Sequence, residues 1–269
     1  MWTASKTLKN LYHNRKKYGT IIYVGRYAKN WKEVIMYSFN SRVRYSEVCT
    51  NKELDFYSII NYFQDCSIFH SEDIGVGLDY LEKHHRLWLM NAWQINVNRF
   101  PVFGEDIAVS TWAYDFNTFY GYRNFMIQDA NEQVLAVANS VWVYMDTLNN
   151  CPARIDDTVT EAYQKEEAYP MEYAPRKILL PKDFSDAPVF SVQRRNLDTN
   201  NHVNNGEYIR MAEEYIPENF KATGMRAEYR KSAVLGDEII PRIHQSDNTL
   251  LVVLSDMNYK PYTIIEYTL

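Results

Sequence analysis

The sequence is poor in glycine and cysteine, and it lacks any long apolar run. Its 269 residues include nine Gly and three Cys, and no apolar stretch approaches the roughly 18 residues that a membrane-spanning helix needs. Cys49, Cys66 and Cys151 are odd in number and widely spaced, so they offer neither a zinc-binding spacing nor a disulfide framework. These absences argue against a membrane protein and against a small disulfide-stabilised one. They favour a protein of the reducing cytoplasm.

Acidic residues are missing from the first 32 positions, which carry eight Lys or Arg. This segment has no clean hydrophobic period and no continuous apolar stretch typical of a secretory signal. Lys32, Glu33 and Val34 can be encoded by a bacterial ribosome-binding sequence, just before Met36. We therefore expect residues 1–35 to be a translated leader or a disordered extension. A basic arm that contacts an acidic partner is the alternative.

Hydrophobic and aromatic residues are plentiful in the rest of the chain. Hydrophobic residues make up 46% of the sequence and charged residues 23%, which predicts folded domains with real cores. The 22 Tyr concentrate in segments that alternate polar and apolar residues, a pattern typical of long strands with one solvent-exposed face. The net charge of −5 argues against general nucleic-acid binding.

The predicted elements occur twice in the same order. A strand over residues 37–48 precedes a helical pattern over 53–75 and several antiparallel strands up to residue 146. The segment 151–182 is charged, carries four Pro and predicts a connector with a short helix around 160–167. A strand over 190–198, a helix over 206–216 and further strands over 225–269 follow.

A local echo supports a tandem duplication. Residues 98–107 resemble residues 230–239, with Gly104 matching Gly236. We therefore predict an α+β protein in which each half wraps one helix with a bent antiparallel sheet. Pairing of the halves edge to edge would protect the sheet edges. We predict that the N-terminal unit covers residues 36–150, the connector residues 151–182 and the C-terminal unit residues 183–269.

The strongest candidate for chemistry is the stretch from Asp198 to His202. Asp198, Asn200 and His202 are spaced by two, so their side chains would share a face in an extended segment. Histidine is the usual side chain for proton transfer in catalysis, so His202 is the candidate base; Asp198 can orient it, and Asn200 can hold a water or a carbonyl oxygen. A polar helix cap without a catalytic role is the alternative that the residues leave open.

A helix is expected to begin directly after this stretch, at Asn204, Asn205 and Gly206. The first N–H groups of a helix lack intrahelical acceptors and carry a partial positive charge, so they can polarise a carbonyl oxygen. Glu207, three residues after Asn204, predicts a variant of the capping box. The two features together predict an oxyanion site beside His202.

The segment DTNNHVNNGEYIRMAEE, residues 198–214, resembles the D-x-N-x-H-V-N-N motif of the acyl-ACP thioesterases, which terminate fatty acid synthesis in plants and bacteria. RVRYSEV, NRFPVFGEDIAVSTW and ANSVWVYMD look like the N-terminal half of that family, so the resemblance extends from about Met36 to the C-terminus. It implies a tandem double hotdog fold, with two long helices each wrapped by a bent antiparallel sheet. It also implies hydrolysis of acyl-acyl carrier protein to free fatty acid.

The motif places the family's catalytic Asp, Asn and His on Asp198, Asn200 and His202. About thirty residues later, Ser232 and Ala233 stand where the family carries Glu and Cys. A thiol nucleophile is therefore excluded from the second half, which favours direct attack by a water held by Asn200, His202 and Ser232. Because a serine is a poor base at neutral pH, His202 or Asp198 must accept the proton.

The resemblance further implies an acyl tunnel in the N-terminal half and a partner, the acidic acyl carrier protein, that docks on a basic surface. The tunnel candidates are Phe63, Phe69, Trp88, Met90 and Trp93, and the docking candidates are Arg194, Arg195, Arg230 and Lys231. No metal or organic cofactor is implied. Cys49 and Cys66 fall in the first half's equivalent of the site, as expected for a duplicated half that has lost its catalytic groups.

Two other functions stay open. One is hydrolysis of acyl-CoA instead of acyl-carrier protein. The other is a non-catalytic acyl-binding hotdog protein, which Ser232 at the family's Glu position motivates. The preferred chain length is not predicted. A homodimer also stays open, because a duplicated hotdog already contains the pairing that single hotdogs obtain by dimerising.

Overall fold

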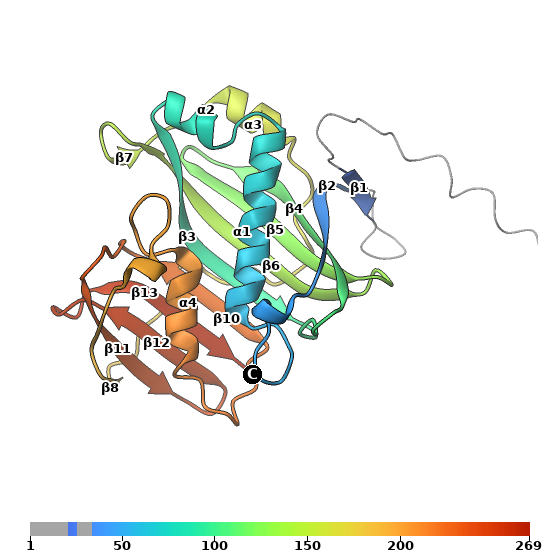
Figure 1. Ribbon diagram of the computed structural model, residues 1–269. Helices are drawn as coiled ribbons and strands as arrows, with labels where there is room; N and C mark the ends of the chain where they lie inside the picture. The colour runs from blue at the N-terminus through green and yellow to red at the C-terminus, as the bar shows by residue number, and fades with distance from the viewer. Residues whose placement is uncertain (1–20, 26–33) are drawn as a thin grey trace, which may run out of the picture.

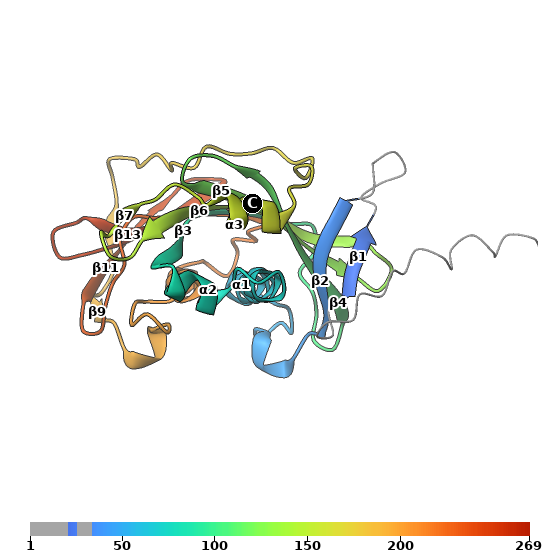
Figure 2. The same ribbon diagram turned by 90° about the horizontal axis from the view of Figure 1, so that it is seen from above.

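One antiparallel sheet runs through both halves of the chain. The computed structural model describes residues 21–25 and 34–269, and the strand order along the sheet is β1-β2-β4-β5-β6-β3-β10-β13-β12-β11-β8. The sheet is bent around the helices α1 and α4, while the connector crosses its outer face (Figures 1 and 2). The predicted α+β architecture is confirmed.

The elements of the first half include two helices before most of the strands. In chain order they are β1 (Ile21–Gly25), β2 (Val34–Arg42), η1 (Tyr45–Glu47), α1 (Phe56–Asp73), α2 (Leu78–Lys83), β3 (Arg86–Val97), β4 (Asp106–Phe116), β5 (Tyr120–Asp129) and β6 (Val134–Asp146). The connector and the second half contain β7 (Cys151–Pro152), α3 (Asp157–Tyr163), β8 (Ser185–Asp186), β9 (Phe190–Ser191), η2 (Arg194–Asn196), α4 (Asn205–Glu213), β10 (Gly224–Tyr229), β11 (Glu238–Gln245), β12 (Thr249–Ser255) and β13 (Pro261–Thr268).

The two halves join where β3 pairs with β10. The strands run antiparallel, with Trp93 opposite Ala227. This pairing removes one exposed edge from each half, which is the reason we expected the halves to meet in this way. The matched turns of the sequence echo also agree, since Gly104 and Gly236 have positive φ angles of 83° and 86°, a conformation that favours glycine.

Helix α1 provides much of the core of the first half. Asp55 caps it by accepting a hydrogen bond from the Ser58 N–H at 2.7 Å, and its buried face includes Ile59, Ile60 and Phe63. Each large side chain buried in this way contributes about 1.5–3 kcal/mol. Phe63→Ala would cost about 3–5 kcal/mol because the surrounding side chains cannot refill the cavity.

The connector covers the outer face of the sheet, and hydrogen bonds join its backbone to side chains of the sheet. The Trp112 indole donates to the Glu167 carbonyl at 2.9 Å, and the Ile178 N–H donates to the Glu228 carboxylate at 2.9 Å. These contacts explain why outward residues such as Trp112 are buried. The short helix expected around residues 160–167 is α3, which begins and ends a few residues earlier.

Several parts of the sequence prediction differ from the structure. The strand expected over residues 37–48 ends at Arg42, and the short helix η1 follows it. The strand expected over residues 190–198 is wrong, because β9 ends at Ser191 and the chain then turns through η2. The turn forms because the Asn196 side chain accepts from the Gln193 N–H at 2.8 Å. Residues 1–20 and 26–33 of the predicted leader lie outside the described residues, whereas residues 21–25 pair with β2. The leader therefore stays a prediction.

Candidate active site

The residues between Leu197 and Val203 form a tight turn. Leu197 pairs with Val203, the Asp198 N–H donates to the His202 carbonyl at 2.7 Å, and Asn201 adopts a positive φ of 60°. The extended segment that we expected here is wrong. Asp198 and His202 come together because the turn closes, and not because alternate residues of a strand share a face.

Asp198 holds this turn through its carboxylate. Its Oδ1 accepts from the Asn200 N–H at 2.8 Å and from the His202 N–H at 3.2 Å. Asn200 is exposed at the tip and His202 is half-buried. Asp198 therefore positions His202 through the backbone of the turn.

The turn is fixed to the loop that carries Ser232. His202 forms an isolated bridge with Val234, and the Val203 N–H donates to the Ala233 carbonyl at 2.9 Å. Ser232, next to Ala233, is exposed. The structure thus places Ser232, the position of the family's acid, beside the turn of Asp198 and His202.

Helix α4 begins at the end of the turn, as predicted, but its cap differs from the expected box. The Asn204 Oδ1 accepts from the Gly206 N–H at 2.8 Å. Glu207 instead accepts from the Asn196 side chain at 2.7 Å, because the Asn204 N–H already donates to the Asn196 carbonyl. Within the described part of the chain, the Asn205 N–H has no acceptor. It is the donor that can polarise a substrate carbonyl, supported by the helix dipole.

Helix α1 contributes residues to this site that the sequence did not indicate. A Cβ at Gly206 would lie 3.0 Å from the Asn61 Oδ1 and 3.4 Å from Tyr57, so glycine permits a close approach of the two helices. Tyr57 lies beside Gly206, and burial raises the pKa of Tyr57. The one feature of the sequence that could have indicated this contact between α1 and α4 is Gly206, because glycine is a poor helix former yet stands in the first turn of a helix.

Two buried tyrosines lock the start of α4 in place. The Tyr208 hydroxyl accepts from the Ala233 N–H at 2.7 Å, and the Tyr229 hydroxyl donates to the Asn205 carbonyl at 3.0 Å. Burial raises the pKa of both hydroxyls, so they stay protonated at neutral pH. They connect α4 to β10 and to the Ser232 loop without supplying a base.

Free positive charge near the turn comes from η2. Arg194 and Arg195 are exposed, and no ion pair involves them among the residues that the structure describes. Arg230, by contrast, pairs with Glu228 at 2.9 Å, and Lys231 pairs with Asp256 at 2.6 Å. Of the four predicted docking residues, the first two offer unneutralised charge.

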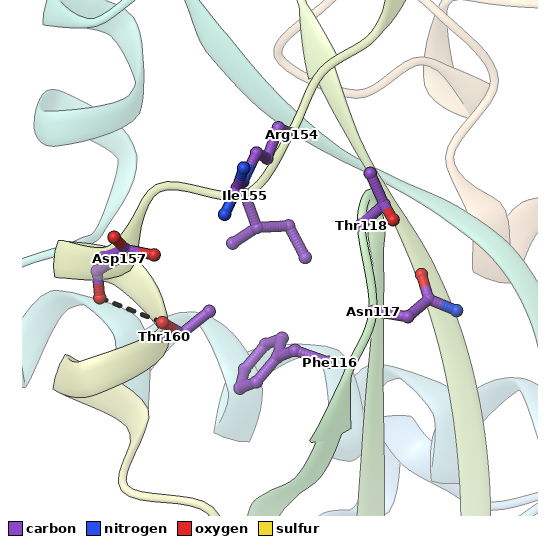
Figure 3. Close-up of a pocket in the computed structure, with 7 residues that line it drawn as sticks. All are labelled: Phe116, Asn117, Thr118, Arg154, Ile155, Asp157 and Thr160. Carbon is purple, nitrogen blue, oxygen red and sulfur yellow. Dashed lines mark hydrogen bonds between the residues drawn. The ribbon is translucent and has the colours of Figure 1, made fainter.

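Two pockets among the described residues lie away from the turn. One of about 430 Å³ sits between the β4–β5 turn and α3 (Figure 3), and another of about 230 Å³ lies where β3 meets β10. The first is lined by Phe116, Asn117, Thr118, Arg154, Ile155, Asp157 and Thr160. The second is lined by Gln94, Asn96, Glu172, Ala174, Gly224, Met225, Arg226 and Thr268. Neither contains a residue of the turn or of the predicted acyl tunnel.

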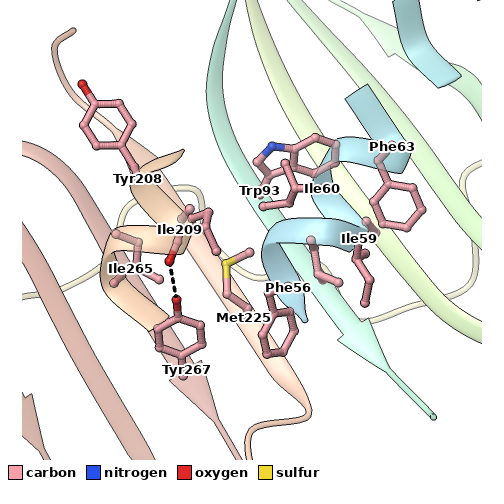
Figure 4. Packing of buried hydrophobic residues seen from close by; sticks show 14 of the residues in the cluster. Phe56, Ile59, Ile60, Phe63, Trp93, Tyr208, Ile209, Met225, Ile265 and Tyr267 are labelled. Carbon is pink, nitrogen blue, oxygen red and sulfur yellow. Dashed lines mark hydrogen bonds between the residues drawn. The ribbon is translucent and has the colours of Figure 1, made fainter. Parts of the chain in front are cut away.

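Three of the five predicted tunnel residues belong to one cluster. Phe63 and Trp93 stack with ring centroids 6.0 Å apart (Figure 4). Met90 belongs to the same buried cluster. Trp88 instead packs against Tyr144 at 4.7 Å, within the cluster that contains Leu81 of α2. Phe69 is 47% exposed.

Neither a metal site nor a membrane-spanning helix is found in the described residues. No group of three or more His, Cys, Asp or Glu is arranged to hold a metal ion there. No helix in that part of the chain is long and apolar enough to cross a membrane.

The fold defines a class, the tandem double hotdog. The structure matches an acyl-ACP thioesterase of Bacteroides thetaiotaomicron with a TM-score of 0.80 at 20% identity, covering 87% of this chain and 97% of that chain. It matches a 12:0-ACP thioesterase of Umbellularia californica with a TM-score of 0.76 at 18% identity, covering 87% and 96%. At these identities the likeness establishes the fold.

Two family models identify the family within that class. The acyl-ACP thioesterase N-terminal domain matches residues 34–163, and the acyl-ACP thioesterase C-terminal domain matches residues 181–260. The chain belongs to the acyl-ACP thioesterase family.

Curated relatives agree with this assignment. The chain is 26% identical over 217 residues to an acyl-[acyl-carrier-protein] hydrolase of Cuphea viscosissima, covering 73% of this chain and 52% of that protein. It is 26% identical over 211 residues to oleoyl-acyl carrier protein thioesterase 2 of Arabidopsis thaliana, covering 72% and 57%. The chain spans about half the length of the curated relatives that it matches.

Proposed function

We propose that this protein is a thioester hydrolase that releases free fatty acid from acyl-acyl carrier protein and so terminates fatty acid synthesis. Family membership supports this activity. The observation that carries it is the turn from Asp198 to His202, which is bonded to the Ser232 loop and leads directly into the N-terminus of α4.

The reaction uses water as the nucleophile. Asn200 holds the water, and His202 removes its proton as the oxygen attacks the thioester carbonyl carbon. The Asn205 N–H polarises the carbonyl oxygen as negative charge develops on it. The carbon–sulfur bond then breaks, and His202 returns the proton to the departing thiolate. No step needs a metal or an organic cofactor.

Ser232 limits how the base is supplied. A serine hydroxyl does not accept a proton at neutral pH, so His202 carries the base function alone, while Asp198 keeps its backbone in place. The same serine motivates the second candidate function, an acyl-binding protein without catalysis. The effect of removing the His202 side chain separates these two functions, as set out in the Discussion.

The acyl carrier protein is the proposed partner, and Arg194 and Arg195 are its proposed contact. Both are exposed, neither has an ion-pair partner among the described residues, and both belong to η2, which leads into the turn. Acidic partners gain association rate and specificity from such charges. The three free cysteines, two of them exposed, support a cytoplasmic location.

Charge reversal tests the partner. The double variant Arg194→Glu/Arg195→Glu should lower kcat/KM on acyl-carrier protein by about tenfold or more and change hydrolysis of acyl-CoA little. Arg230→Glu/Lys231→Glu is the matched control; because both of its charges are already paired, the effect should be smaller. An equal loss on both thioesters would contradict Arg194 and Arg195 as the contact specific to the carrier protein.

A further inference from the structure

Helices α1 and α4 correspond to each other residue by residue when they are counted from the turns that precede them. Before α1, the Cys49 N–H donates to the Glu53 carbonyl at 2.9 Å. Before α4, the Asp198 N–H donates to the His202 carbonyl at 2.7 Å. Because the two turns share this hydrogen bond, the same position can be compared directly in the two helices.

The contacts between the two helices follow this correspondence. Tyr57 of α1 corresponds to Gly206 of α4, and Asn61 is matched by Arg210. A Cβ at Gly206 would lie 3.0 Å from the Asn61 Oδ1. The Arg210 Cζ lies 5.4 Å from the centre of the Tyr57 ring. Exchange of the two helices converts the first contact into the second, so α1 and α4 pack with approximate twofold symmetry.

The first half shows which group lies at the start of its own long helix. Phe56 is the first residue of α1, and its N–H donates to the Glu213 Oε1 of α4 at 2.9 Å. The first N–H groups of a helix have no acceptor within the helix, so this contact satisfies one of them. An oxygen atom of the opposite helix therefore lies at the counterpart of the place where the second half is proposed to bind the substrate carbonyl oxygen.

The start of α4 differs at the matching positions. The Asn205 N–H, which corresponds to the Phe56 N–H, has no acceptor among the described residues. The counterpart of Glu213 is Gln64 of α1, and within the part of the chain that the structure describes, the hydrogen bonds of Gln64 use its backbone. Both Gln64 and Asn205 are half-buried. The twofold packing therefore places an uncommitted amide side chain beside the Asn205 N–H, where a ligand can reach both.

We infer that Gln64 is a catalytic residue of the proposed hydrolase, and that its Nε2–H and the Asn205 N–H donate to the same thioester carbonyl oxygen. This inference rests on the proposed function. Glutamate at the matched place of the first half accepts from the helix N–H, whereas glutamine can donate alongside it. Two converging donors stabilise the negative charge that develops on the oxygen as water attacks. Gln64 transfers no proton, so the proton path through His202 is unchanged.

Removal of the amide tests this role. Gln64→Met keeps the length of the side chain and a good helix former but has no N–H donor. It should lower kcat for thiol release from acyl-carrier protein by about a hundred- to a thousandfold, the usual loss for one oxyanion donor. KM and the unfolding temperature should change little, whereas a merely structural role would lower the unfolding temperature. A wild-type kcat in Gln64→Met would overturn the inference and leave the hydrolase in place.

The matched position on α4 supplies the control. Glu213→Gln places an amide at the start of α1, in the half without the proposed chemistry, and should keep kcat near the wild-type value. Gln64→Glu instead copies the first half onto the second, because its carboxylate can accept from the Asn205 N–H and has no N–H to donate. It should lose at least as much kcat as Gln64→Met. A kcat equal to or above wild type in Gln64→Glu would contradict the donor role.

A binding measurement separates this inference from the proposed function. A long-chain alkyl trifluoromethyl ketone forms a hydrate that resembles the tetrahedral intermediate and has no thiol to lose. Titration calorimetry should show about tenfold or more weaker binding to Gln64→Met than to wild type or Glu213→Gln. This difference in a protein that hydrolyses no thioester would support the contact and remove the hydrolase proposal alone. Equal affinity of wild type and Gln64→Met, or no binding to wild type, would overturn the inference.

Discussion

The two halves build the same turn before their long helix, but from different residues. In the second half the Asp198 N–H donates to the His202 carbonyl at 2.7 Å, and in the first half the Cys49 N–H donates to the Glu53 carbonyl at 2.9 Å. Both turns also contain a residue in the left-handed region, with φ of 60° at Asn201 and 66° at Lys52. The backbone of the site is therefore a property of the repeat.

The side chains of the two turns perform different tasks. Cys49 donates its thiol to the Asp55 carboxylate at 3.3 Å, and burial together with Asp55 raises the pKa of Cys49 to about 12. Such a thiol is a poor nucleophile at neutral pH. Glu53 accepts from Asn51 of its own turn at 2.7 Å. The comparison teaches that the duplicated backbone is kept for the fold, whereas the proposed chemistry belongs to one copy.

Removal of the imidazole should have the largest effect. His202→Ala should lower thiol release from acyl-carrier protein by a factor on the order of a hundred to ten thousand, the usual contribution of general acid–base catalysis. Its unfolding temperature should change little, because the described bonds of His202 use its backbone. Glu53→Ala, the matched change in the first turn, should leave the rate nearly unchanged. An equal rate for His202→Ala and wild type would remove the enzyme and leave an acyl-binding protein.

Asp198→Ala should have the next largest effect. It removes the acceptor of two backbone N–H groups, which should cost about 1–2 kcal/mol in the free energy of unfolding and lower the rate about ten- to a hundredfold through displacement of His202. Asp198→Asn keeps an acceptor and should be milder. Cys49→Ala should affect both measurements less. Urea unfolding and thiol release report the two effects, and a full rate in Asp198→Ala would contradict the positioning role.

A smaller gain is expected from restoring the family's acid. Ser232→Glu places a carboxylate on the exposed loop that is bonded to the turn, where it can share proton transfer with His202, and should raise kcat about tenfold. Ser232→Gln matches its size without the charge and should not raise kcat. If the two variants have the same kcat, the missing acid does not limit the reaction.

The smallest effect is a change in the pH dependence of stability. Glu213 of α4 accepts from the Phe56 N–H at 2.9 Å, at the start of α1, and burial and then Asp55 raise its pKa well above the ordinary value of 4.5. The folded protein therefore holds this proton more tightly than the unfolded chain, so the free energy of unfolding falls as the pH rises above 4.5 toward the folded-state pKa.

Glu213→Gln should remove that contribution. Gln64 of the first half follows Glu53 by the same number of residues as Glu213 follows His202. Glutamine is therefore a suitable replacement at position 213. Thermal unfolding across pH should show the variant gaining stability over wild type as the pH rises, with the smallest difference below pH 4.5. Parallel stability profiles for the two proteins would mean that Glu213 keeps an ordinary pKa when folded.

The spacing of hydrophobic residues along the sequence predicted most of the helices and strands. The long helix, the antiparallel strands that follow it and the edge-to-edge pairing of the halves were all expected and are present. The strand over residues 190–198 was wrong because Asn196 hydrogen-bonds the backbone three residues earlier. The helical period could have predicted that Phe69 is exposed. Phe69 follows Phe63 by six residues, a rotation of about 600°, or about 240° around the helix axis, which turns it away from the buried stripe.

The sequence by itself determined the composition of the site. Short polar side chains at Asp198 and Asn204 bond the backbone within four residues, so the turn and the cap are encoded locally. Only the tertiary structure decided which distant groups meet there. Register across the sheet and packing of the helices bring the Ser232 loop to His202, Asn61 to Gly206 and Glu213 to the start of α1. Such contacts depend on strand pairing within the second half and on how the two halves pack together, neither of which a local pattern records.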